Sequence, residues 1–211
     1  MSKKYTLVKS DTVTTWDGRK LFRIKAAVAI VALGIAKGDL GGYIESEENL
    51  SQVYGNAWVS GDAWVYGDAR VYGDARVSGN ARVSGDAWVY GNARVSGNAW
   101  VSGDAWVYGD ARVYGNARVS GNARVSGNAW VSGVNLTATR SDGYTFLVAP
   151  TPEGPRIIAG CRYFDFDQAE RHWAETRGGT KLGDESLSIV AHLKRMAELN
   201  GFMEPVAGEA A

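Results

Sequence analysis

The stretch VYGDARVYGDARVSGNARV (residues 65–83) decides the fold, because it repeats nearly the same six residues three times. The pattern V-[YS]-G-[DN]-A-[RW] continues without insertion or deletion for thirteen hexads, from Val53 to Trp130. Within it, Val and Ala alternate with outward residues, which is the period-two pattern of a strand with one buried face. Gly followed by Asp or Asn marks a corner, since these residues tolerate a positive φ. The repeat therefore predicts a coil of short strands and corners.

No hexad can bury its Val and Ala alone, so successive coils must stack to form a core, as in solenoid proteins. The hexad resembles that of hexapeptide-repeat proteins, and this resemblance implies a left-handed parallel β-helix with three sides and three hexads per coil. The usual crossover rule favours right-handed winding, so the left hand rests on the resemblance alone. The predicted fold class is mainly β, with a three-sided left-handed solenoid between two different ends.

Both ends of the chain depart from the hexad, and each is expected to cap an open stack of strands. YTLVK, TVTTW and KLFRIKA read as a hairpin that turns at Asp17-Gly18. Residues 38–52 echo the repeat irregularly and predict one or two looser coils. The predicted domains are the N-terminal hairpin (1–27), the solenoid (28–134) and a C-terminal α+β domain (135–211).

In the C-terminal domain, residues 137–150 and 156–164 read as two strands on either side of a Pro/Gly turn. Two amphipathic helices follow. Asp167 is the predicted N-cap of the first helix, QAERHWAETR, and Asp184 that of the second, ESLSIVAHLKRMAEL.

Composition excludes several classes of protein. The 23 basic residues balance the 23 acidic ones, so the chain has neither the basic field of a duplex nucleic-acid binder nor the acidity of a DNA mimic. A single cysteine excludes an internal disulfide and a thiolate zinc site. The first ten residues lack the apolar core of a signal peptide, and the apolar run 26–36 is too short to span a bilayer. We therefore expect a soluble cytoplasmic protein that has no membrane partner.

Three hexads per coil place outward residues in columns 18 residues apart. The first side carries Trp58, Arg76, Arg94, Arg112 and Trp130; the second carries Trp64, Arg82, Trp100 and Arg118; the third carries Arg70, Trp88, Trp106 and Arg124. Guanidinium groups about 4.8 Å apart repel one another, and an anion would relieve the repulsion. The first side is thus a predicted strip for phosphate or carboxylate, with Trp58 and Trp130 as stacking walls. In the alternative interpretation, the guanidinium groups stack on Trp and on one another while corner Asp74 and Asp110 neutralise them, which gives a solvated face.

The third side is the most aromatic and is the predicted surface for self-association. Its aromatic residues are Tyr72, Trp88, Tyr90, Trp106 and Tyr108. The resemblance to hexapeptide-repeat proteins implies a homotrimer, and a ligand platform is the alternative. Residues 53–88 also match 95–130 at all but three positions, an offset of seven hexads that rotates the copy onto another side. Such a rotation favours a scaffold over a finely tuned pocket.

Catalytic residues are scarce. The hexads contain no histidine, so the metal site and catalytic base found in many hexapeptide-repeat enzymes have no counterpart, and we expect no metal and no cofactor. Cys161 and His172 are a possible nucleophile pair, although core packing is the simpler reading. The loop RGGTKLGDES offers Arg177, Thr180 and Lys181 to an anion, with a purely structural loop as the alternative.

The motifs RIKA, GDLGGYIESEENLSQ, TRSDGYTF, AGCRYF and RGGTKLGDES, together with the hexads, resemble a family of hexapeptide-repeat proteins from phages and prophages of enteric bacteria. This resemblance, together with a surface rich in Arg, Trp and Tyr, favours a non-enzymatic accessory protein that blocks or sequesters a host component in anti-defence; a nucleotide sponge is one version of this hypothesis. Its partner would be a host protein or a nucleotide-like molecule. A structural or assembly protein of a phage is the first alternative, and an enzyme acting through the C-terminal domain is the second.

Overall fold

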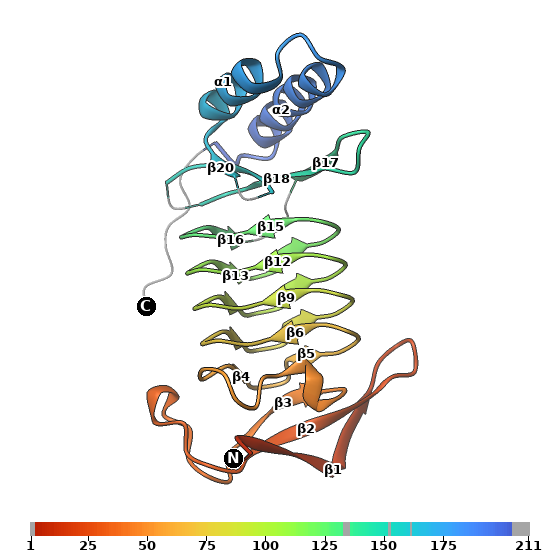
Figure 1. Ribbon diagram of the computed structural model, residues 1–211, viewed down its shortest axis with the longest axis vertical. Helices are drawn as coiled ribbons and strands as arrows, with labels where there is room; N and C mark the ends of the chain where they lie inside the picture. The colour runs from red at the N-terminus through yellow and green to blue at the C-terminus, as the bar shows by residue number, and fades with distance from the viewer. Residues whose placement is uncertain (1–2, 133–135, 152, 161, 204–211) are drawn as a thin grey trace.

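The computed structural model describes residues 3–132, 136–151, 153–160 and 162–203, which form a β-solenoid with a hairpin at its base and an α+β domain on its top (Figure 1). The hairpin consists of β1 (Tyr5–Thr14) and β2 (Lys20–Ala26). Strand β2 pairs antiparallel with β3 (Leu40–Ile44), and β3 pairs parallel with the solenoid strand β5. The predicted hairpin is therefore confirmed, and it is continuous with one side of the solenoid.

Each hexad contributes one short strand. The thirteen solenoid strands are β4 (Trp58–Val59), β5 (Trp64–Val65), β6 (Arg70–Val71), β7 (Arg76–Val77), β8 (Arg82–Val83), β9 (Trp88–Val89), β10 (Arg94–Val95), β11 (Trp100–Val101), β12 (Trp106–Val107), β13 (Arg112–Tyr114), β14 (Arg118–Val119), β15 (Arg124–Val125) and β16 (Trp130–Ser132). They pair in parallel as three sheets, in the orders β4-β7-β10-β13-β16, β5-β8-β11-β14 and β6-β9-β12-β15. Every pair joins residues 18 apart, so the three predicted columns are confirmed; left-handed winding stays a prediction.

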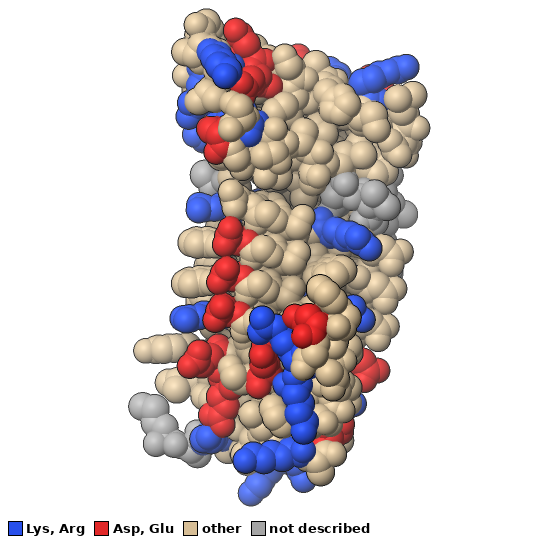
Figure 2. Space-filling model, turned by 90° about the vertical axis from the view of Figure 1, so that its right-hand side faces the viewer, with Lys and Arg blue, Asp and Glu red and all other residues tan. Residues whose placement is uncertain are grey.

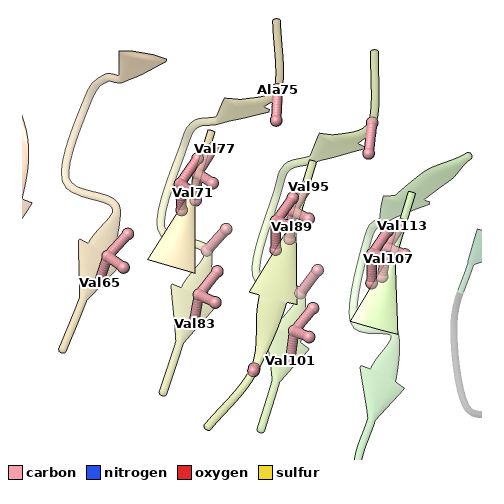
Figure 3. Packing of buried hydrophobic residues seen from close by; sticks show 14 of the residues in the cluster. Val65, Val71, Ala75, Val77, Val83, Val89, Val95, Val101, Val107 and Val113 are labelled. Carbon is pink, nitrogen blue, oxygen red and sulfur yellow. The ribbon is translucent and has the colours of Figure 1, made fainter. Parts of the chain in front are cut away.

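The solenoid core is a stack of valines and alanines that point inward from all three sheets (Figure 3). Val89, Val95 and Val101, for example, are fully buried, and so are the alanines that precede each strand. Burying one such valine stabilises the fold by about 1.5–3 kcal/mol relative to leaving it exposed. This gain exists only between coils, which explains why the repeat continues for so long.

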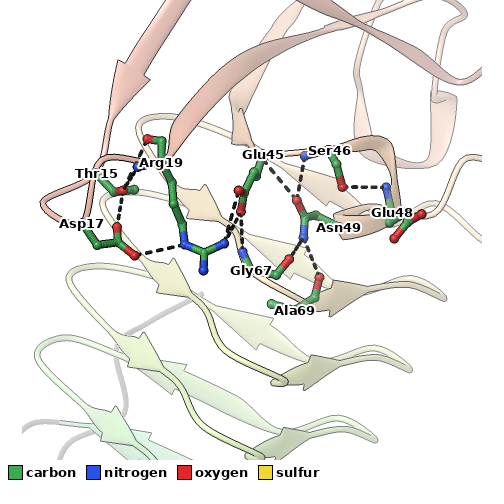
Figure 4. A network of polar contacts seen from close by, with 9 residues as sticks. All are labelled: Thr15, Asp17, Arg19, Glu45, Ser46, Glu48, Asn49, Gly67 and Ala69. Atoms are coloured by element: carbon green, nitrogen blue, oxygen red, sulfur yellow. Dashed lines mark hydrogen bonds and ion pairs between the residues drawn. The ribbon is translucent and has the colours of Figure 1, made fainter.

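The base is tied to the first regular coil by a polar network (Figure 4). Arg19, at the start of the hairpin's return, pairs with Asp17 of the turn at 3.0 Å and with Glu45 at 3.1 Å. Glu45 accepts the Gly67 N–H at 2.8 Å. Asn49, at the end of the short 3-10 helix η2 (Glu47–Asn49), donates to the carbonyls of Gly67 and Ala69 at 2.9 Å. These side chains satisfy backbone groups that a further coil would otherwise satisfy.

The C-terminal domain contains four strands where two were expected. The strands are β17 (Leu136–Thr139), β18 (Thr145–Ala149), β19 (Arg156–Ala159) and β20 (Arg162–Phe164), and they form one antiparallel sheet. Each predicted strand is folded back on itself at a glycine of positive φ, Gly143 in the first and Gly160 in the second. The prediction of two long strands was wrong because these turn signals lie inside apolar runs.

The sequence-based helix starts were also wrong. Helix α1 (Phe166–Arg177) is capped by Asp165, whose carboxylate accepts the Gln168 N–H at 2.7 Å while the Gln168 side-chain oxygen accepts the Asp165 N–H at 3.0 Å. This reciprocal capping box selects Asp165 over Asp167. Helix α2 (Lys181–Leu199) begins after Thr180, whose hydroxyl accepts the Gly183 N–H at 3.1 Å, so Asp184 lies in its first turn.

The C-terminal sheet closes the top of the solenoid, as Figure 1 shows. Leu147 and Ile158 lie on one face of the sheet and join the solenoid core. Phe146 and Ile157 lie on the other face and pack against the helices, in the cluster that includes Trp173. The predicted capping of both ends is confirmed. Neither α1 nor α2 has the length and apolar character needed to cross a membrane.

Candidate functional site

The sheet β4-β7-β10-β13-β16, called the arginine face below, carries the column predicted to bind an anion. Trp58, Arg76, Arg94, Arg112 and Trp130 follow one another in register up this sheet. The hexads explain the alignment, because each is six residues long and three of them complete a coil. Any ligand that contacts one of these side chains also lies beside the next one.

Two hollows divide the arginine face. The larger, the lower hollow, has a volume of about 690 Å³, within the usual range of ligand sites. Its lining residues are Leu33, Ile35, Asp39, Leu40, Trp58, Ser60, Arg76, Ser78, Arg94 and Ser96. The upper hollow, of about 310 Å³, lies under the C-terminal domain and is lined by Asp110, Arg112, Asn128, Trp130, Thr151, Glu153 and Tyr163. The predicted single strip is thus divided between two separate hollows.

Arg76 and Arg94 in the lower hollow are exposed, and no described residue forms an ion pair, hydrogen bond or ring contact with the side chain of either. The carboxylates predicted to neutralise the column bond elsewhere. Asp74 accepts the Asn56 side-chain amide at 2.9 Å, and Asp110 accepts that of Asn92 at 3.0 Å. The two guanidinium groups therefore remain available to a ligand.

Apolar side chains form the lower wall of this hollow. Leu33 ends the short 3-10 helix η1 (Val31–Leu33), and Ile35 pairs back to Ile30 in an isolated bridge. Leu40 is 56% exposed. From sequence, residues 26–36 were recognised as an apolar run too short for a membrane span, and no site was predicted there. This run has neither the period of a strand nor that of a helix. Its apolar side chains must therefore pack against another surface, and that inference could have placed the run beside a site.

Acidic groups are few at the lower hollow. Asp39 is its one lining carboxylate among the described residues, and one of its oxygens accepts the Ala36 N–H at 2.8 Å. The one file of three successive aspartates, Asp68, Asp86 and Asp104, follows the corner between the other two sheets. Figure 2 shows such a file of acidic side chains along an edge of the solenoid. With two arginines against Asp39, the lower hollow has a net positive charge.

The two tryptophans of the column do not act as exposed walls. Trp58 is only 5% exposed and packs edge-on against Tyr5, with ring centroids 6.5 Å apart, so it belongs to the floor of the lower hollow. Trp130 is covered by Arg112, whose guanidinium carbon lies 4.7 Å from the ring centroid. In the upper hollow Asp110 offsets the charge of Arg112, and Glu153 pairs with Arg156 at 3.1 Å. Arg112 therefore separates from the Arg76–Arg94 pair, contrary to the prediction of one strip.

The predicted self-association surface is an aromatic ladder on sheet β6-β9-β12-β15. Tyr72, Tyr90 and Tyr108 stack with ring centroids 4.9 and 5.0 Å apart, and Trp88 stacks on Trp106 at 5.4 Å. Burial raises the pKa of Tyr90, and the neighbouring Tyr108 adds to the effect. All five rings are half-buried, because each covers the face of the next.

The C-terminal candidates are divided by the start of α2. Arg177 and Thr180 line a cavity of their own, whereas Lys181 lies 3.8 Å from Glu185 and lines a different hollow. Cys161 lies outside the described residues, so its suggested pairing with His172 stays a prediction. Within the described part of the chain, no three His, Cys, Asp or Glu side chains gather as they would around a metal ion.

Comparison with known families indicates which repeat the strands of the arginine face resemble. The family model described as "YdcK Beta solenoid repeat" matches residues 51–67, 63–78, 75–91, 87–103, 105–119 and 117–133. The hexad array is therefore similar to YdcK beta-solenoid repeats. No curated protein matches the chain. The matched residues include β4 to β16, so they supply both guanidinium groups and the serines of the lower hollow. The apolar wall and the C-terminal domain lie outside them.

Proposed function

We propose that the protein is a non-enzymatic binding protein whose lower hollow holds a small anionic ligand with an apolar or aromatic part, of the nucleotide class. The unpartnered pair Arg76 and Arg94 carries this proposal. Their phosphate-binding guanidinium groups stand one coil apart, and their mutual repulsion, on the order of 1 kcal/mol in water, is relieved by an anion. Leu33, Ile35 and Leu40 supply the apolar side.

The rigidity of the solenoid supports tight capture of such a ligand. Each arginine is followed in its strand by a fully buried valine, Val77 or Val95. Both strands, β7 and β10, are paired with a neighbouring strand on each side. A preformed site loses less conformational entropy on binding than a flexible one. In an infected bacterial cell, a site of this kind would sequester a host nucleotide as a sponge. The flanking motifs shared with phage and prophage hexapeptide-repeat proteins support that setting, the cytoplasm, and an anti-defence role.

Isothermal titration calorimetry with ADP tests the proposal at low salt, where phosphate contacts are strongest. We expect wild type to bind and Arg76→Ala and Arg94→Ala each to weaken binding about tenfold or more, the cost of a lost charge-assisted hydrogen bond. Arg82→Ala is the matched control, because Arg82 occupies the same hexad position on another side and lies over Trp64. No binding by wild type, or equal losses in all three variants, would overturn the proposal.

A structural or assembly role is the second candidate, favoured by the aromatic ladder. In this proposal the ladder mediates self-association, as the trimers of hexapeptide-repeat proteins suggest. Sedimentation velocity should then show a trimer for wild type and for Trp100→Lys, on the second side, but a folded monomer for Trp106→Lys. A wild-type monomer at micromolar concentration, or a trimer that tolerates Trp106→Lys, would count against this role.

A further inference from the structure

A separate cavity lies in the C-terminal domain, between its sheet and its helices. Its volume is about 640 Å³. The lining residues are Arg140, Asp142, Tyr144, Arg162, His172, Trp173, Thr176, Arg177 and Thr180. They come from the β17–β18 turn, from β20, from α1 and from the start of α2. Three arginines and one carboxylate in a single cavity give it a net positive charge even when His172 is neutral.

Arg140 is a fixed part of the cavity rather than a free ligand group. Its guanidinium donates to both carboxylate oxygens of Asp142, at 2.9 and 2.7 Å, and to the Ser186 hydroxyl at 2.9 Å. Its hydrogen bonds to Asp142 lower the pKa of Asp142 to about 2, so the pair is ionised and neutral overall. Thr180 is also engaged, since it donates to the Arg177 carbonyl and accepts the Gly183 N–H.

Arg162 and Arg177 are the two charges left without compensation. Both are exposed, and no described residue forms an ion pair, hydrogen bond or ring contact with either guanidinium group. They approach the cavity from different elements, β20 and the last turn of α1. Two guanidinium groups that form no ion pair with a described residue match the charge of a phosphate dianion.

His172 reports on this pair of arginines. Its ring packs between Phe164 and Trp173, with centroids 5.0 and 5.1 Å away. Burial lowers the pKa of His172, and Arg162 and Arg177 lower it further, while Glu175 opposes them. Imidazole and both guanidinium groups therefore interact within one site. An anion bound there would stabilise the imidazolium and raise the pKa of His172.

We propose that this cavity binds a phosphate group, through Arg162 and Arg177, either as free phosphate or as the terminal group of a small phosphomonoester. The site is independent of the lower hollow and shares no residue with it. Phosphate binding would also give the C-terminal domain a role beyond capping the solenoid. A domain that served only as a cap would not need two arginines without ion-pair partners.

NMR titration of the His172 imidazole in the full chain tests the proposal, with ionic strength held constant by chloride. Millimolar inorganic phosphate should raise the pKa of His172 by about one unit, while the exposed His192 on α2 provides an unchanged reference resonance. Glycerol phosphate distinguishes the sources: a shift at lower concentration than with inorganic phosphate assigns the site to a phosphomonoester, and the reverse order assigns it to free phosphate.

The double variant Arg162→Gln/Arg177→Gln completes the test. Without phosphate, its His172 pKa should lie above that of wild type, because two cations have been removed, and this change verifies the geometry and the fold together. Its response to phosphate should be lost. If the wild-type His172 pKa does not move with either phosphate compound, or if the double variant responds like wild type, the cavity is not a phosphate site.

Discussion

Gly97→Ala should lower the free energy of unfolding by about 3 kcal/mol, whereas Gly127→Ala should lower it by about 1 kcal/mol. The two glycines occupy identical hexads, VSGNAW at 95–100 and at 125–130. Both have a positive φ, of 69° and 61°, so both variants carry the cost of a left-handed alanine. Any further difference between them must come from what surrounds the added methyl group.

The surroundings differ because only Gly97 has a described coil stacked on it. A Cβ at Gly97 would lie 2.9 Å from the Gly115 nitrogen and 3.1 Å from its carbonyl oxygen, whereas a Cβ at Gly127 would meet no atom of a described residue within 4 Å. Relief of the clash requires two backbone segments to separate, which weakens the pairing of strands above and below. Urea unfolding of both variants measures the difference. Equal destabilisation would mean that the positive φ alone requires glycine at these corners. It would also mean that the coils are too loosely stacked for the added methyl group at residue 97 to clash.

The same regularity explains which parts of the site could be predicted from sequence. Once the repeat is six residues with no insertions, the alignment of Arg76, Arg94 and Arg112 follows by counting. The position of Leu33 and Ile35 beside that column could not be predicted in this way, because residues 27–40 have no repeat period. Their placement depends on contacts with residues that are distant in sequence. The division of the column into two hollows therefore appeared only in three dimensions.

In the C-terminal domain, local competition limited the sequence predictions. Asp165 and Asp167 are both plausible helix caps, and the choice depends on which one can bond reciprocally with Gln168. Arg140 was not predicted as part of a site at all. Its partner Ser186 lies 46 residues away in sequence, so no local pattern connects the turn to the cavity it frames.

Lys4→Met should raise the free energy of unfolding by about 3 kcal/mol at pH 7. Lys4 is only 7% exposed, and among the described residues its Nζ has no hydrogen-bond partner. Burial lowers the pKa of Lys4 from 10.5 to about 8, and attraction to Asp74 offsets only part of this effect. At neutral pH the folded protein therefore holds a desolvated ammonium group, and methionine fills a similar volume without that cost.

The pH dependence identifies the cause. Between pH 8 and 10.5 the unfolded chain keeps the Lys4 proton while the folded chain releases it, so wild-type stability should rise with pH across this window. The advantage of Lys4→Met should be full below pH 8 and shrink as pH increases. Urea unfolding of both proteins from pH 7 to about pH 9.5 measures this change below the range in which tyrosines ionise. Lys9→Met, at an exposed position on β1, should have little effect at any pH.

A gap between wild type and Lys4→Met that stays constant with pH would show that the folded protein keeps the Lys4 proton, and the explanation by desolvation would fail. The backbone of Lys4 should be unaffected by the substitution, because its N–H donates to Gln52 at 2.8 Å and its carbonyl accepts the Ala27 N–H at 2.9 Å. Ala27 begins the segment that leads to the apolar wall of the lower hollow. Lys4→Met should therefore bind ADP as wild type does, which separates the stability of the base from the chemistry of the arginine face.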